Sequence, residues 1–209
     1  MSPTDPDPLG PFDVSRETRQ LLHTYEALLR RWQGVKNLVA PTTLAVVWER
    51  HFRDSLQLKA ICPEAKTWVD IGAGAGFPGM VIAIASRNEP GSLVLLIESD
   101  NRKCAFLREV ARATGAPAKV VHDRAENIVA LLPVVDVVTA RAVAPLDKLV
   151  EIAMPLLENG ATGLFPKGRE FRAELTRLSL PSTFSVDAVP SQTEEGAAII
   201  VIRGPHARA

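Results

Sequence analysis

The sequence lacks the features that cross-link secreted proteins or anchor proteins in membranes. It has two cysteines, Cys62 and Cys104, which are too few for a disulfide framework and lack metal-ligand spacing, so we expect reduced thiols and no bound metal. No apolar run reaches the roughly 18 residues of a membrane helix. Residues 1–12 are rich in Pro and Asp and do not form a basic, apolar signal. We therefore expect a soluble, cytoplasmic protein.

The chain also lacks net charge, because 24 Lys and Arg balance 24 Asp and Glu. The overall charge thus does not indicate a nucleic-acid partner, which is bound by local basic clusters. Two such clusters are present, one between residues 14 and 53 and one after residue 166. Their members are Arg16, Arg19, Arg30, Arg31, Lys36, Arg50 and Arg53, then Lys167, Arg169, Arg172 and Arg177. Each is either a solvated face or a binding surface.

Short apolar segments alternate with helical ones over most of the chain, whose 209 residues are 46% hydrophobic and suit one α/β domain. This alternation predicts a parallel, doubly wound sheet. Two last segments, joined by a polar stretch, suit an antiparallel hairpin. The predicted strands are 67–71, 93–97, 119–121, 134–138 and 163–165, followed by 183–189 and 197–202.

Two helices are predicted before the sheet. Ser15 is placed to cap the first, which ends at Gly34, and the second follows Pro41 with His51 and Phe52 on its apolar face. We therefore divide the chain into a flexible N-terminus (1–13), a helical extension (14–62) and a sheet domain (63–209). The extension and the sheet domain are expected to form one compact unit.

A glycine-rich turn follows the first predicted strand. Asp70 ends the strand, and Gly72, Gly74 and Gly76 lack the Cβ that would prevent a tight turn against a ligand. Glu98 ends the second strand about 26 residues after Gly72, near the roughly 20-residue spacing of ribose-binding acids. The turn therefore indicates an adenosine cofactor, although acids that merely end strands beside solvent remain an alternative.

The type of cofactor is less clearly marked, because Gly74, Gly76 and Gly79 also fit the GxGxxG spacing of dinucleotide sites. Two features favour S-adenosylmethionine. Asp70 stands where dinucleotide loops usually continue an apolar strand. Pro78 has no N–H to donate to a pyrophosphate.

Several motifs in order give the chain a family resemblance. The glycine loop, Asn37-Leu38 and residues 50–56, 96–103, 139–142 and 165–168 together resemble the bacterial guanine-N7 methyltransferases of 16S rRNA, also called glucose-inhibited division protein B. The resemblance runs from about Tyr25 to the C-terminus. It implies a class I S-adenosylmethionine-dependent methyltransferase fold, a Rossmann-like, mainly parallel sheet with an antiparallel C-terminal hairpin and an N-terminal helical extension.

The resemblance also implies a reaction and a set of site residues. S-adenosyl-L-methionine would be the cofactor, S-adenosyl-L-homocysteine the product, and a loop guanosine of 16S rRNA, in the small subunit or an assembly particle, the target. Arg141 would orient the reactants. The implied cofactor residues are Asp70, Gly72, Gly74, Gly76, Phe77, Glu98, Ala125, Glu126 and Arg141, and the RNA-facing residues are His51, Arg53, Asp54 and Lys167.

Plainer roles remain open for some of these residues. His51 suits a core position, Glu126 the first turn of a helix, Lys167 a turn, and Arg141 a surface ion pair. Three residues depart from the family pattern: Ala73 replaces a hydroxyl residue, Gln33 an Asn, and Pro166 an apolar residue. These departures affect expected affinity more than activity.

The implied chemistry agrees with what the chain lacks. Guanine N7 carries a free lone pair, so its methylation needs alignment and no general base. The chain has no Pro-Pro segment, which exocyclic-amine methylases use, and no cysteine near the fourth or fifth strand for attack on cytosine. Since N7 lies in the deep groove of A-form RNA, the target should be unpaired. An NAD-dependent oxidoreductase and a non-catalytic S-adenosylmethionine-binding regulator remain as alternatives, and we expect a monomer.

Overall fold

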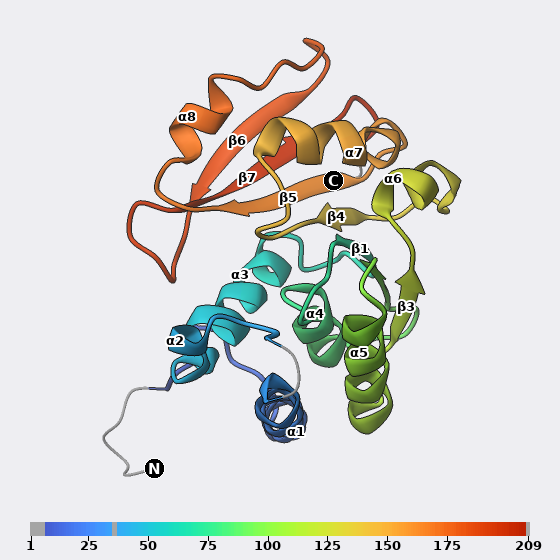
Figure 1. The fold of residues 1–209 in the computed structure, drawn as a ribbon. Helices are drawn as coiled ribbons and strands as arrows, with labels where there is room; N and C mark the ends of the chain where they lie inside the picture. The colour runs from blue at the N-terminus through green and yellow to red at the C-terminus, as the bar shows by residue number, and fades with distance from the viewer. Residues whose placement is uncertain (1–6, 35–36, 208–209) are drawn as a thin grey trace.

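The computed structural model describes residues 7–34 and 37–207. In this part of the chain, seven strands form one sheet in the order β3-β2-β1-β4-β5-β7-β6 (Figure 1). β1 to β5 run parallel, and β7 pairs antiparallel with both β5 and β6, as predicted. The strands are β1 (Thr67–Ile71), β2 (Leu93–Glu98), β3 (Ala118–His122), β4 (Val137–Thr139), β5 (Thr162–Lys167), β6 (Ser185–Pro190) and β7 (Ala198–Arg203).

The fourth strand starts later than the predicted residue 134. Its approach is held by Asp136, whose carboxylate accepts hydrogen bonds from the backbone N–H groups of Lys66 and Thr67 at 2.9 and 2.8 Å. The regular ladder with β1 therefore begins only at Val137. The Asp136 N–H also donates to the Thr67 carbonyl at 3.0 Å, so side chain and backbone of Asp136 together join the start of β4 to β1.

Helices cover both faces of the sheet, and each face has its own apolar core (Figure 1). One face carries α4 (Gly79–Ala85) and α5 (Asn101–Thr114). The other carries α6 (Ala125–Ile128), η2 (Val129–Leu131), α7 (Leu146–Glu158) and α8 (Phe171–Leu175). This is the doubly wound arrangement that the alternating sequence predicts.

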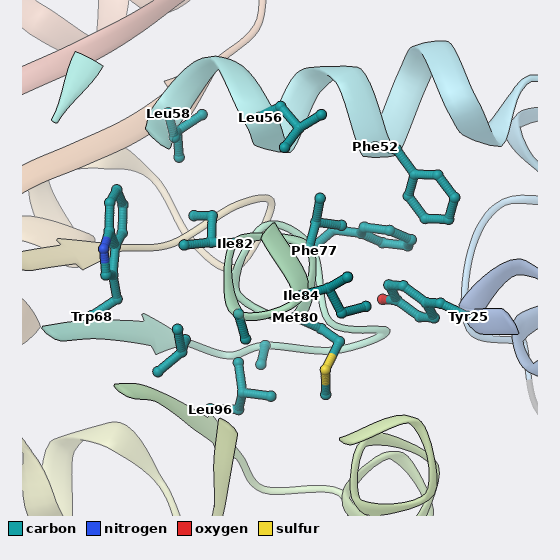
Figure 2. Close-up of a cluster of buried hydrophobic side chains, with 14 of the residues drawn as sticks. Tyr25, Phe52, Leu56, Leu58, Trp68, Phe77, Met80, Ile82, Ile84 and Leu96 are labelled. Atoms are coloured by element: carbon teal, nitrogen blue, oxygen red, sulfur yellow. The ribbon is translucent and has the colours of Figure 1, made fainter. Parts of the chain in front are cut away.

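The N-terminal segments form a further layer on α4. They are α1 (Arg16–Gln33), α2 (Pro41–Leu44), η1 (Trp48–Arg53) and α3 (Asp54–Ile61). In Figure 2, Phe52, Leu56 and Leu58 point from η1 and α3 towards α4, and the sheet residues Trp68 and Leu96 approach it from the other side. A helix enclosed in this way must be apolar all round, which explains the sequence Gly-Met-Val-Ile-Ala-Ile-Ala of α4.

The caps predicted for α1 are confirmed. Ser15 accepts a hydrogen bond from the Thr18 N–H, and Gly34 is the C-terminal cap. The prediction of one continuous second helix is wrong, because the chain forms α2, a π-helical turn and then α3. A π turn takes up one more residue than an α turn, and apolar spacing does not register it.

The predicted division into segments stays a prediction. Residues 1–6 of the expected flexible N-terminus, and Lys36 of the first basic cluster, lie outside the described residues. Within the rest of 1–13, Leu9 is buried and Asp7 pairs with Arg19 at 2.7 Å. Among the described residues, no helix combines the length and the apolar character that crossing a membrane requires.

Candidate active site

The turn between β1 and α4 adopts a conformation that requires glycine. Gly72, Gly74 and Gly76 have φ values of 66, 58 and 95°, which side chains rarely tolerate. At Gly76 a Cβ would also lie 2.6 Å from Tyr25 Oη. The glycines counted as cofactor residues therefore shape the backbone at the carboxyl end of β1, where open α/β sheets bind ligands.

Asp70 is fully buried beneath this turn. Its Oδ2 accepts a hydrogen bond from the Gly79 N–H at 2.9 Å, whereas Oδ1 has no hydrogen-bond partner among the described residues. Burial raises the pKa of Asp70 to about 7, and the hydrogen bond from Gly79 opposes this rise. A buried carboxylate with a free oxygen is costly unless a positive group approaches it.

Glu98 connects the end of β2 to the same turn. Its Oε2 accepts from the Gly74 N–H at 2.8 Å, and its Oε1 accepts from the Asp100 N–H at 2.7 Å. The side chain is buried, so these bonds fix its position between two loops. Each oxygen keeps a second lone pair, and the predicted ribose contact stays a prediction.

A small pocket opens beside the turn, with a volume of about 130 Å³. We call it the glycine-loop pocket. It brings together four predicted cofactor residues, namely Gly72, Glu98, Ala125 and Glu126, and Val143 forms another wall. Sequence reasoning placed the first four at the ends of three different strands, and they do meet here. Val143 was missed, because a lone apolar residue in a loop gives no signal.

Phe77 connects the glycine turn to the N-terminal extension. Its ring stacks on His51, with centroids 4.6 Å apart, and on Tyr25, with centroids 5.4 Å apart. Tyr25 in turn donates a hydrogen bond from its hydroxyl to the Ala75 carbonyl in the turn. The guanidinium of Arg141 lies 5.3 Å from the centre of the Phe77 ring. Phe77 thus contacts the extension and Arg141 at once.

Arg141 is held by the N-terminal extension. Its Nη1 donates to Asp54 Oδ2 at 2.9 Å, and its Nη2 lies 2.8 Å from His51 Nδ1. Burial, and next the charge of Arg141, lower the pKa of His51 to about 4. His51 is therefore neutral near pH 7, with Nδ1 accepting from Arg141 and Nε2 bonded to Thr43 Oγ1 at 3.0 Å.

A second cavity, of about 650 Å³, has Arg141 in its wall, and we call it the Arg141 cavity. Its walls come from η1 and α3, the loop after β4, the end of β5, α8 and the 191–197 loop. The predicted residues His51, Asp54, Arg141 and Lys167 all line it. Arg53 does not line the cavity; it donates to the Gln192 carbonyl at 3.1 Å.

Sequence reasoning missed several residues of this cavity. Gln57 is buried and bonds both Asp54 and the Gln192 N–H. Its spacing of three from Asp54 on a helix is the signal that would have found it. Arg50, Glu174 and Glu194 also line the cavity. Glu194 reaches Arg50 across 144 positions of sequence, a pairing that no local pattern indicates.

The fold has clear structural relatives. A methyltransferase from Geobacter sulfurreducens matches with a TM-score of 0.60 at 17% identity, covering 88% of each chain. The cofactor-bound Rv0187 from MTB matches with a TM-score of 0.63 at 16% identity, covering 90% of this chain and 91% of that one. With the strand order and the glycine turn, these matches define the fold as that of the class I S-adenosylmethionine-dependent methyltransferases.

Sequence comparison then gives the family. The model of rRNA small subunit methyltransferase G matches residues 18–197. The enzyme of that name from Methylorubrum populi is 52% identical over 92% of this chain and 91% of its own. The one from Rhodospirillum centenum is 53% identical over 90% of this chain and 85% of its own. The chain belongs to the rRNA small subunit methyltransferase G family, as the resemblance predicts.

Proposed function

We propose that this protein methylates N7 of a guanosine in 16S rRNA of the small ribosomal subunit, with S-adenosylmethionine as the donor. The observation that carries the proposal is the position of Arg141. The loop that begins with this residue lines the glycine-loop pocket through Val143 and the Arg141 cavity through Arg141 itself. A loop between two cavities suits an enzyme that must bring a donor and an acceptor together.

The residues of the glycine turn and of the pocket beside it fit the donor. Asp70 has a buried oxygen without a partner, and Glu98 is a second carboxylate beside the turn. S-adenosylmethionine carries a sulfonium and an ammonium, and nearby carboxylates stabilise positive charge. We propose that it is held by the residues named from the sequence: Asp70, Gly72, Gly74, Gly76, Phe77, Glu98, Ala125, Glu126 and Arg141. When bound, it supplies a methyl group whose bond to sulfur breaks as the bond to N7 forms.

The neighbours of Arg141 suit a reaction without a general base. Both ring nitrogens of His51 are already bonded, one to Arg141 and one to Thr43. His51 therefore has no free nitrogen with which to remove a proton, and guanine N7 has no proton to lose. In this proposal, Arg141 orients the acceptor base, while Asp54 and His51 hold Arg141 in place.

In this proposal, the RNA substrate binds at the Arg141 cavity. His51, Asp54 and Lys167 line it, and Arg53 directly precedes Asp54 in the sequence. The exposed side chains of Arg50 and Arg177 are the cations most open to phosphates. An unpaired guanosine entering between them would meet Arg141, which lines the same cavity.

The geometry of the turn disfavours an NAD-dependent oxidoreductase. The N–H groups of Ala73, Gly74 and Gly76 donate to the Ile97 carbonyl, Glu98 and the Ala73 carbonyl. Pro78, which precedes α4, has no N–H. A dinucleotide pyrophosphate needs several of these donors free, whereas the methionine end of S-adenosylmethionine needs fewer.

A methyl-transfer assay tests the proposal. Tritiated S-adenosylmethionine is incubated with naked 16S rRNA, an assembly particle or finished small subunits, all from cells without the modification, and the label is mapped to a guanosine. We expect transfer by the wild type, a loss of about 100-fold in Arg141→Ala, and unchanged transfer by Arg31→Ala, whose exposed side chain pairs with Glu109 on α5.

The same assay distinguishes the remaining alternative. A protein that binds S-adenosylhomocysteine in calorimetry but labels none of the three RNA substrates is a non-catalytic regulator, and the proposal fails. The preferred substrate identifies the assembly state that is methylated. The monomeric state and the cytoplasmic location stay predictions.

A further inference from the structure

The loop after β4, residues 141–145, has a backbone conformation that its sequence does not favour. Ala142 has φ of 56°, in the left-handed region that residues with a Cβ seldom occupy. Such a conformation persists only where neighbouring contacts fix it, and these positions cluster at functional sites. The 141–145 loop must therefore be held from both ends.

One end of the loop is fixed through Arg141 by Asp54 and His51, as described above. The middle packs on the glycine turn, because a Cβ at Gly72 would lie 2.6 Å from Val143 Cγ2. Through Arg141 and Val143, the loop sets the boundary between the Arg141 cavity and the glycine-loop pocket. A displacement of the loop therefore changes the Arg141 cavity and the glycine-loop pocket at the same time.

The other end of the loop is fixed by Lys167 and Glu174. Lys167 Nζ donates to the Ala144 carbonyl at 3.0 Å and pairs with Glu174 Oε2 at 2.8 Å. Glu174 Oε2 also accepts from the Leu146 N–H, the first residue of α7, at 2.6 Å. The Lys167 side chain is only 9% exposed. Its ammonium is thus turned towards the loop and a carboxylate, which compete with any phosphate for its protons.

We propose that Lys167 and Glu174 are positioning residues for methyl transfer. They hold the 141–145 loop, and through it Arg141, in line with the glycine turn, and Lys167 acts on the loop instead of on an RNA phosphate. The inference rests on the proposed function. Direct displacement depends on alignment, and a shift of about 1 Å can cost about 100-fold in rate.

The first test compares Lys167→Met and Glu174→Gln with the wild type in steady-state methyl transfer. We expect kcat to fall about 30-fold in Lys167→Met and about 10-fold in Glu174→Gln, with the KM for RNA within about threefold. The double variant should be no slower than Lys167→Met, because both changes break one contact. Lys148→Met, which removes an exposed lysine on α7 paired with Glu151, should leave kcat and KM unchanged.

The salt dependence of RNA affinity shows whether Lys167 binds a phosphate or positions the 141–145 loop. A lysine that neutralises a phosphate contributes about 0.7 to 0.9 to the slope of log affinity against log salt. We expect Lys167→Met to keep the wild-type slope and Arg177→Met, on the same cavity, to reduce it. If Lys167→Met reduces the slope and raises the KM while keeping kcat, Lys167 binds phosphate and the proposal is wrong. Unchanged kcat in both variants also overturns it.

Hydrogen exchange tests the inference without RNA or donor. In the ligand-free protein, the amides of residues 141–144 and of Leu146 should exchange at least 10-fold faster in Lys167→Met and Glu174→Gln than in the wild type. Unchanged exchange refutes the positioning role, even if the wild type transfers no methyl group and the proposed function itself fails. Glu174→Gln keeps an oxygen for the Leu146 N–H, so it decides the question if Lys167→Met does not fold.

Discussion

The glycine-loop pocket and the Arg141 cavity lie on either side of one loop but are built differently. At the glycine turn beside the pocket, carboxylates accept from backbone N–H groups over shorter separations: Asp70 is 9 residues from Gly79, and Glu98 is 24 from Gly74. In the cavity, side chains pair with side chains over long separations. Asp54 is 87 residues from Arg141 and 139 from Thr193.

This difference determines which substitutions matter on each side. A site made from backbone conformation depends on the absence of side chains, so its sensitive positions are glycines. A site made from paired side chains depends on charge and on the elements that carry each partner. The first is visible in a short sequence motif, and the second becomes visible only when the fold brings its members together.

The largest expected loss of stability and donor binding comes from a substitution in the glycine turn. Gly76→Ala places a Cβ 2.6 Å from Tyr25 Oη and 2.8 Å from Met80 Cβ, at φ of 95°. Backbone strain and overpacking together should lower the free energy of unfolding by about 4 kcal/mol. Binding of S-adenosylhomocysteine should fall at least 100-fold. Urea unfolding and calorimetry measure the two effects.

Gly74→Ala is the matched control for Gly76→Ala. It has a similar left-handed backbone, with φ of 58°, but the nearest atom to its Cβ is the Gly72 carbonyl oxygen at 3.7 Å. Only the strain of about 1 kcal/mol should remain. Equal losses of stability in the two variants would show that packing against Tyr25 does not shape the turn.

A second effect on the backbone side comes from Asp70, the buried acid beneath the glycine turn. The pKa of Asp70 is raised to about 7, so between pH 4 and 7 the folded protein holds a proton that the unfolded chain has lost. This group therefore lowers stability as pH rises through that range, by up to about 4 kcal/mol. Asp70→Asn should remove this decline and stabilise the ligand-free protein at pH 8, while weakening donor binding about 10-fold.

Titration of His51, which lines the Arg141 cavity, should change stability with pH in the opposite direction. Its pKa is lowered to about 4, so below pH 6.5 the unfolded chain takes up a proton that the folded protein refuses. Stability from this group is complete above pH 6.5 and is lost as pH falls to 4, by about 2 kcal/mol after allowance for partial exposure. His51→Gln should remove this loss.

In the wild type, the pH dependences of stability that come from Asp70 and His51 partly cancel, so single variants are needed to separate them. Urea unfolding between pH 4.5 and 7.5 should give a shallow dependence for the wild type, a rise with pH for Asp70→Asn, and a steeper fall for His51→Gln. Parallel curves for all three proteins would show that neither group titrates between folded and unfolded states as described.

Much of the glycine-loop pocket was predictable because its determinants are local. A β-branched strand, an acid and alternate glycines fix Asp70 and the turn, and strand spacing brings Glu98 and Ala125 to the same edge. For the Arg141 cavity, the sequence indicated several lining residues but not how they pair. Arg141 was placed by its strand end, but its partner Asp54 lies after a π turn that apolar periodicity cannot show.

Lys167 shows the limit of sequence reasoning most clearly. A lysine after a strand in a basic segment predicts a phosphate contact, and the sequence gives no sign that Glu174 lies 2.8 Å away. That pairing arises because α8 folds back beside the end of β5 and the start of α7. Lys167 and Glu174 are only 7 residues apart, but the contacts that give the pair its role, with Ala144 and Leu146, span 23 and 28 positions and are decided by the whole fold.

The smallest expected effect tests whether the two sides are independent. Gln57 is buried, donates to Asp54 Oδ1 at 2.7 Å and accepts from the Gln192 N–H at 3.0 Å, so it joins α3 to the 191–197 loop. Gln57→Leu removes both bonds and takes the acceptor from the Gln192 N–H, although Asp54 Oδ1 keeps its bond from Thr193 Oγ1, and it should cost about 1 to 2 kcal/mol, or about 2 to 8 °C in Tm. The exposed Gln20→Leu on α1 is the matched control.

Gln57→Leu should affect RNA and donor unequally. Because Gln57 lines the Arg141 cavity and not the glycine-loop pocket, the KM for RNA should rise about threefold, while the affinity for S-adenosylhomocysteine should stay within error. Calorimetry and methyl transfer at saturating donor measure the two quantities separately. If donor affinity falls as much as RNA binding, the side-chain network also supports the backbone site, and the 141–145 loop transmits the change because it contacts both.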